Sequence, residues 1–171
     1  MRRVREVMAL VGLATAWGIP TYAISHGLKE RIPVHFDWAG QADRWGSRSE
    51  LWALPAIAFG VYFLLTIVPR FSGAFNYPVP VTKENHARLR TRALEMIGWL
   101  KAELMLLMAF LVFFEVESAQ LGTTGNLPPY LFAGVGIVLI TVGAFWRAMF
   151  RDAKPGSATI SGAHPTSRTK N

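Results

Sequence analysis

The side chains best suited to chemistry lie in one short polar stretch. His35 and Asp37 are two residues apart, and Asp43 follows beyond Gly40. Polarity alternates over residues 34–38, which predicts an extended segment with the histidine and the first aspartate on one face. Such a pair can bind a cation, or act as a base and its orienting carboxylate, and Asp43 can supply a third metal ligand. The alternatives are that these groups only order the loop, or that they recognise a ligand or peptide.

Two further charged residues, Lys101 and Glu103, border a strongly apolar run. Residues two apart do not share a face of a helix, so we expect different surroundings for them. The long lysine side chain is expected to reach the lipid headgroups. Glu103 is shorter, and a carboxylate inside a membrane usually faces a bundle interior or a wet cavity and marks an ion or proton path. The alternative is a span displaced outward, which leaves Glu103 at the membrane interface.

A basic helical stretch begins near Thr82. A surface facing lipid headgroups is the first interpretation, and docking of a cytosolic protein is the second. The sequence has no phosphate-cradling glycine loop, nucleophile elbow or His-Glu-x-x-His pattern, and it has no cysteine. We therefore expect a protein that is not an enzyme and has no cofactor. The candidate docking residues are His86, Arg88, Arg90 and Arg92.

Four apolar runs must position these groups. Hydrophobic residues make up 51% of the 171 residues and charged residues only 17%, against about a quarter in soluble domains. A bilayer core about 30 Å thick needs roughly 20 helical residues. We predict an all-α membrane domain over residues 1–153, followed by a disordered cytoplasmic tail at 154–171. Its four transmembrane helices, the first retained and not cleaved as a signal, are expected at residues 7–24, 51–68, 96–115 and 127–147.

The charges indicate the orientation of these spans. The net charge is +7, and fourteen of the eighteen basic residues fall in the terminal segments and the segment 69–103. Basic residues gather on the cytoplasmic side of membrane proteins, so both termini are predicted to be cytoplasmic. The loop 25–50 is then extracytoplasmic. Because the basic residues are dispersed among span ends, the bilayer is the expected partner and a nucleic acid is not. The expected location is the bacterial inner membrane.

Local patterns predict the ends and contacts of the helices. Ser47 and Glu50 fit a capping box that opens the second helix, and Thr82 is a plausible N-cap for the third. Gly40 and Gly46 are expected to permit turns. Small residues at helical spacing allow close packing in lipid, and the alternative is that glycine and alanine are simply common in membrane helices. They are Ala9, Gly12 and Ala16 in the first helix, and Gly136 and Gly143 in the fourth.

The run from Arg31 to Ser47 resembles the signature of a bacterial membrane family, domain of unknown function 1648. That signature is Ile-Pro-x-His-Phe-(Asn/Asp)-x-x-Gly-x-x-Asp after a first membrane span. A second block resembles many relatives at residues 76–78, 82–85 and 96–101, so the resemblance covers roughly residues 7–110. The motif residues, taken as candidates for ligand binding, are Ile32, Pro33, His35, Phe36, Asp37, Gly40 and Asp43.

The best-understood relatives in that family protect a bacterium from its own cannibalism toxin. They detect a secreted peptide toxin and tether a cytosolic repressor at the membrane. The resemblance implies a multi-pass plasma-membrane protein with an extracytoplasmic motif. We expect a non-enzymatic sensor, immunity or accessory protein whose loop 31–46 binds a peptide or partner. The alternatives are a small ion- or proton-coupled transporter using Glu103, a structural subunit, and a membrane enzyme with a metal at the loop.

Overall fold

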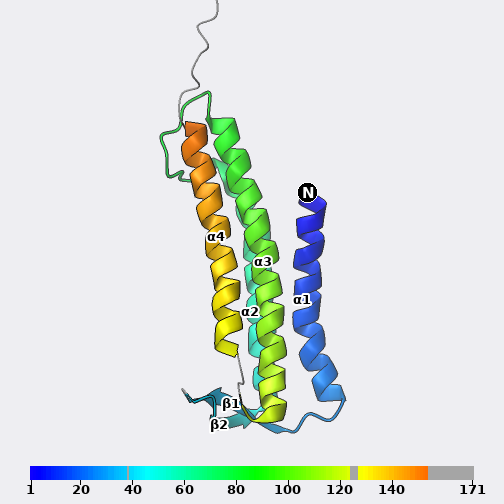
Figure 1. Ribbon diagram of the computed structural model, residues 1–171. Coiled ribbons are helices and arrows are strands. Elements are labelled where there is room, and N and C mark those ends of the chain that lie inside the picture. The colour runs from blue at the N-terminus through cyan, green and yellow to red at the C-terminus, as the bar shows by residue number, and fades with distance from the viewer. Residues whose placement is uncertain (38, 124–126, 154–171) are drawn as a thin grey trace, which may run out of the picture.

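A computed structural model describes residues 1–37, 39–123 and 127–153 of the chain. Four long helices run side by side, and a two-stranded antiparallel hairpin lies across one end of the bundle (Figure 1). Two 3₁₀ segments flank the second helix. The elements are α1 (Arg2–Ser25), β1 (Arg31–Phe36), β2 (Ala42–Ser47), η1 (Arg48–Trp52), α2 (Ala53–Ile67), η2 (Val68–Ala74), α3 (His86–Leu121) and α4 (Leu127–Ala153).

The described residues contain four helices that are long and apolar enough to cross a membrane. This confirms the predicted number of spans, and the protein has the build of a multi-pass membrane protein. Helices α1, α3 and α4 extend beyond the predicted spans, whereas α2 lies within the predicted span 51–68 and is flanked by 3₁₀ segments. At about 1.5 Å per residue, the 36 residues of α3 extend about 54 Å, so this helix continues beyond a bilayer core of about 30 Å. The predicted tail at 154–171 lies outside the described residues.

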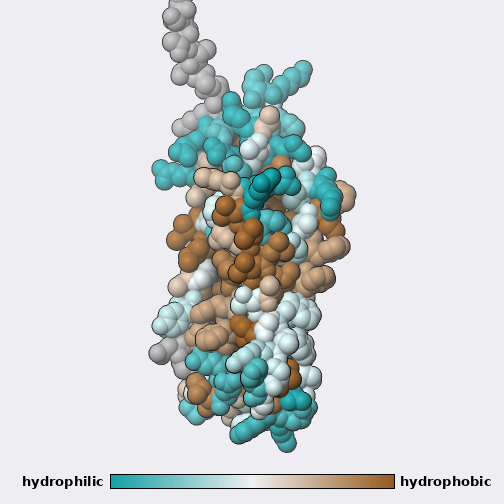
Figure 2. All heavy atoms as spheres, turned by 90° about the vertical axis from the view of Figure 1, so that its right-hand side faces the viewer, coloured by the Kyte–Doolittle hydropathy of each residue, from teal (hydrophilic) through white to brown (hydrophobic). Residues whose placement is uncertain are grey.

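The two ends of the bundle differ in chemistry. The start of α3 and the end of α4 lie together at one end, and α1 begins lower along α3 in the same half of the bundle, which we call the basic end (Figure 1). The segment η2 contacts the start of α3 there. The hairpin, the end of α3 and the start of α4 lie at the other, the hairpin end. Figure 2 shows a hydrophobic band between two hydrophilic ends. Three basic segments that are far apart in the sequence therefore meet at one end.

Helix α3 is central and packs against each of the other three helices. The small residues Ala9, Gly12 and Ala16 are buried where α1 meets α3. At Gly12 the two backbones touch, because an added Cβ would lie 2.7 Å from the carbonyl carbon of Met105. This confirms the packing predicted for the first helix. In α4 the prediction was wrong: an added Cβ at Gly136 or Gly143 would meet nothing, whereas one at Gly134 would meet the Leu107 side chain.

Two helix starts differ from the prediction. The Ser47 hydroxyl accepts from the N–H of Ser49, but it opens the 3₁₀ segment η1, and α2 begins only at Ala53. Helix α3 begins at His86 with Asn85 as its N-cap. Thr82 stands one turn earlier, where its N–H donates to Oδ1 of Asn85 and its hydroxyl accepts from the Asn85 N–H. A hydrogen bond from the Thr82 side chain also lowers the pKa of the exposed Glu84 carboxyl.

Candidate functional site

The polar stretch singled out above forms the β1–β2 hairpin. Strand β1 agrees with the predicted extended segment, and its partner β2 was not predicted. The register pairs Ile32 with Gly46 and His35 with Arg44, and it is irregular on both sides of His35. Trp38, which the alternation placed on the face of Val34, lies outside the described residues. The loop is therefore a small sheet rather than one extended segment.

Asp37 builds the turn of the hairpin. Its Oδ1 accepts from the N–H groups of Ala39 and Gln41 at 2.8 and 2.9 Å. The N–H of Gly40 donates to the Asp37 carbonyl, and Gly40 has a φ of +76°, where a side chain would be strained. Asp37 and Gly40 thus supply the usual chemistry of a tight turn. The carboxylate oxygen that makes these bonds is occupied by backbone donors.

His35 pairs with Asp43 and not with Asp37. Its Nδ1 lies 2.6 Å from Oδ1 of Asp43, and both side chains are exposed to solvent. The irregular register places the two side by side. With Nδ1 engaged, Nε2 is the ring atom left for a ligand. No group of three or more metal-ligating side chains able to hold a metal ion occurs in the described residues, so the three candidates do not form such a site.

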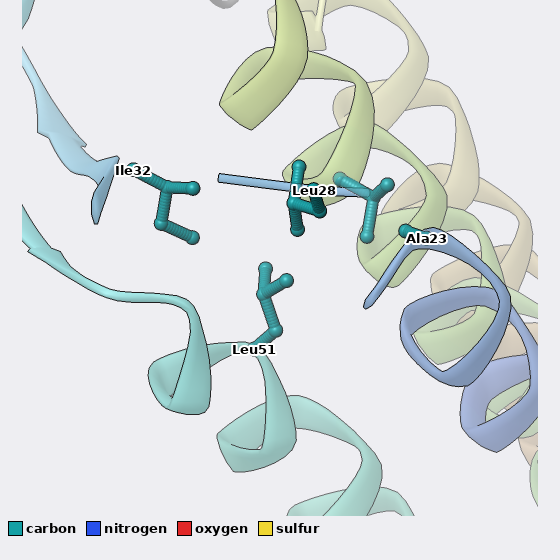
Figure 3. Packing of buried hydrophobic residues seen from close by; sticks show 5 residues of the cluster. Ala23, Leu28, Ile32 and Leu51 are labelled. Carbon is teal, nitrogen blue, oxygen red and sulfur yellow. The ribbon is translucent and has the colours of Figure 1, made fainter. Parts of the chain in front are cut away.

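The apolar residues of β1 attach the hairpin to the bundle. Ile32 is fully buried in a cluster with Ala23, Leu28 and Leu51, which come from the end of α1, the loop after it and the 3₁₀ segment η1 (Figure 3). Val116 of α3 completes the cluster. Pro33 is also buried and Phe36 is half-buried. An isolated two-stranded hairpin is marginally stable in water, so this anchor explains how the hairpin holds its shape.

The base of the hairpin has a second attachment, through Arg48. Its N–H donates to the Glu30 carbonyl, its Nε lies 2.9 Å from the Glu30 carboxylate, and its guanidinium donates to the Leu28 carbonyl. Gly46 was expected to permit a turn, and that prediction was wrong. It lies within β2, and its missing side chain leaves space for the Glu50 carboxylate, which an added Cβ would overlap.

Lys101 belongs to a polar cluster inside the bundle at the basic end. Its Nζ lies 2.5 Å from Oε2 of Glu6 and 4.8 Å from the centroid of the Tyr62 ring. The Tyr62 hydroxyl donates to Oε1 of Glu6 at 2.7 Å. The expectation that Lys101 reaches the lipid headgroups was wrong, because a carboxylate from α1 neutralises it inside the bundle. The signal that could have found this cluster is a lone acidic residue, Glu6, at the head of an apolar run.

Glu103 faces the opposite neighbour, α4. The Thr141 hydroxyl donates to its Oε1 at 2.6 Å, and its Oε2 is buried without a hydrogen-bond partner in the described part of the chain. Lys101 and Glu103 therefore face different helices, as their spacing predicts. The position is a contact between α3 and α4. Interhelical hydrogen bonds of this kind join membrane helices.

The basic stretch at the start of α3 is partly used within the fold. Arg90 donates to the hydroxyl of the buried Ser72, and Arg92 lies 3.1 Å from the Asp152 carboxylate at the end of α4. Arg88 reaches the Asp152 carbonyl, and His86 is exposed in the first turn of α3. Of the four candidate docking residues, three arginines thus join neighbouring elements. The surface that they leave to a partner is smaller than the sequence suggested.

The hairpin is also where the chain resembles known proteins. Residues 10–59 match the family model Domain of unknown function (DUF1648). This segment holds most of α1, the whole hairpin and the start of α2. An uncharacterized protein of Archaeoglobus fulgidus is 39% identical over 72 residues, which is 40% of this chain and 38% of that protein. The chain thus aligns with well under half of this relative. No solved structure matches the chain.

The match covers the first of the two resemblance blocks, and the second lies outside it. Neither similarity carries a toxin-immunity or signalling role, and the relative is archaeal. The structure shows that these motif residues shape the hairpin and attach it to the bundle. Ile32 anchors it, Asp37 and Gly40 turn it, and His35 with Asp43 joins its strands.

Proposed function

We propose that this protein is a non-enzymatic membrane receptor or accessory protein whose hairpin binds an extracytoplasmic peptide or protein. The observation that supports this proposal is the exposure of three consecutive side chains of β2, Asp43, Arg44 and Trp45. Strand β1, in contrast, is packed against the helix bundle through Ile32. Half of the Trp45 surface is open. Tryptophan and arginine are enriched where proteins bind one another, and a short sheet can accept a further strand along its edge.

A crosslinking experiment tests this recognition role. We expect a photoreactive amino acid at Trp45 to give a crosslinked product of discrete mass in cells, containing a peptide or protein. The Asp37→Ala variant, which lacks the turn bonds, should lose the product several-fold. The matched control is the same amino acid at Tyr130, an exposed aromatic at the start of α4. Adducts formed only with lipid at both positions would show that Trp45 is an interfacial anchor, and the recognition role would fall.

The proposal also requires the hairpin to face outward. The chain has no cysteine, so single cysteines can report sidedness cleanly. In intact cells, Arg44→Cys should react with a membrane-impermeant maleimide, and Lys83→Cys should react only after permeabilisation. This follows from the gathering of basic residues at the end opposite the hairpin. Reaction of Lys83→Cys from outside would reverse the orientation and with it the proposed role.

A second candidate function is ion- or proton-coupled transport centred on Glu103. The observation in its favour is the buried Oε2 that has no hydrogen-bond partner in the described residues, since intramembrane carboxylates often mark ion paths. Glu103→Gln keeps the acceptor for Thr141 and removes the titratable group. It should then reduce ion-dependent flux in proteoliposomes at least tenfold, while Glu117→Gln leaves it unchanged. Equal flux through both variants and the unmodified protein would leave Glu103 a structural contact.

A further inference from the structure

A cavity at the basic end opens between α1, α2 with η2, and α3. Its volume is about 870 Å³. Five cationic side chains line it, one of them at its inner limit inside the bundle. The end of the molecule that holds it is hydrophilic and lies directly above the hydrophobic band (Figure 2). The cations are Arg2, Arg3, Arg5, Arg70 and Lys101.

The described lining of the cavity holds more cations than carboxylates. Two carboxylates also line the cavity, and Glu6 is paired with Lys101. The other, Glu95, lies 3.7 Å from Arg92, which is outside the cavity lining. Within the described segments, the four arginines of the cavity form no ion pair with a carboxylate. The cavity therefore presents an excess of positive charge to whatever enters it.

Arg5 is held in place before any ligand arrives. Its guanidinium donates to the Glu95 carbonyl at 3.3 Å and lies 5.7 Å from the centroid of the Trp99 ring. Gly98 makes room for it, since an added Cβ there would lie 3.3 Å from its Nε. That Nε is buried and lacks a partner in the described part of the chain. With Nε buried and Nη1 bonded to the Glu95 carbonyl, Nη2 is the nitrogen of this fixed guanidinium that is left to donate to a phosphate oxygen.

The cavity wall is not uniformly polar. Leu65 of α2 and Leu94 and Ile97 of α3 also line it. A small inorganic anion would use only the cations, whereas a lipid has a charged headgroup and an apolar chain. Basic pockets between membrane helices suit anionic headgroups. The combination of arginines with an apolar wall therefore favours a lipid over a free ion.

We propose that this cavity binds the phosphate headgroup of an anionic phospholipid, with the acyl chain against Leu65, Leu94 and Ile97. Arg2, Arg3 and Arg70 supply the charge at the mouth, and Arg5 supplies a fixed positive charge with one oriented donor, Nη2. The site is separate from the hairpin, so it stands whether or not the hairpin binds a partner.

Native mass spectrometry of the detergent-purified full chain tests the site, with phosphatidylglycerol, phosphatidylcholine and inorganic phosphate as probes. We expect phosphatidylglycerol to bind at least tenfold more tightly than phosphatidylcholine. The double variant Arg3→Gln/Arg70→Gln should weaken phosphatidylglycerol binding about tenfold or more, because each basic residue contributes to headgroup attraction. Both arginines are exposed, so the fold is retained. The control Lys83→Gln/Arg147→Gln removes the same charge outside the cavity and should bind normally.

Three results would overturn the proposal. One is equal binding of the two lipids by the unmodified protein. Another is undiminished phosphatidylglycerol binding by Arg3→Gln/Arg70→Gln, or an equal loss in the control variant, which would mean general surface charge. The third is displacement of the lipid by millimolar inorganic phosphate, which would identify a free phosphate as the ligand of the cavity.

Discussion

Gly12→Ala should destabilise the helix bundle, while Gly18→Ala should leave it intact or stabilise it slightly. A Cβ at Gly12 would lie 2.7 Å from the carbonyl carbon of Met105 and 2.8 Å from the Leu106 nitrogen. These are backbone atoms, so no side chain can turn aside and α1 must move away from α3. Overpacking of this kind costs about 1–3 kcal/mol in the free energy of unfolding.

Gly18 is the matched control because it lies in the same helix and a Cβ there meets nothing within 4 Å. Alanine is preferred to glycine in a helix by about 0.5–1 kcal/mol, so the two variants should differ in sign. Thermal unfolding in detergent, followed by circular dichroism or by the monodisperse fraction after heating, measures both. Equal midpoints for the two variants would mean that α1 and α3 do not touch at Gly12.

Glu6→Ala should be the more damaging of the two ways to break the Glu6–Lys101 pair. The Lys101 side chain is 8% exposed and that of Glu6 is 42% exposed. Removing Glu6 leaves a buried ammonium group whose other hydrogen-bond partner is the Thr66 hydroxyl at 3.4 Å. Breaking a buried pair in this way costs about 3–5 kcal/mol of unfolding free energy.

Lys101→Met should cost less, about 2 kcal/mol, because the Glu6 carboxylate still accepts from the Tyr62 hydroxyl and still reaches water. The double variant Glu6→Ala/Lys101→Met buries no lone charge and should be more stable than Glu6→Ala alone. The control Glu95→Ala breaks an exposed pair with Arg92 at the same end and should cost under about 1 kcal/mol. If the double variant is less stable than Glu6→Ala, the unpaired Lys101 ammonium group does not destabilise the fold.

The hairpin shows which features of a structure local sequence patterns can predict and which they cannot. Strand β1 and a turn at Gly40 were predictable because alternation and a glycine act over a few residues, whereas the part that Asp37 takes in the turn was not predicted. Strand β2 was not, since Ala42–Ser47 has no alternation of apolar residues and becomes a strand only by pairing with β1. The sequence also placed His35 with Asp37, whereas the irregular register places it with Asp43, and no local pattern encodes that register.

The four apolar helices, a turn at Gly40 and the gathering of basic segments on one side were predictable from the sequence. These depend on composition and spacing along the chain, which a helix or a turn expresses directly. Which charged side chains pair depends instead on how the helices pack. Lys101 and Glu6 are 95 residues apart, and Glu103 pairs with a hydroxyl 38 residues away. The free energy of burying a charged group depends on which group lies next to it, and the packing of the helices determines that neighbour.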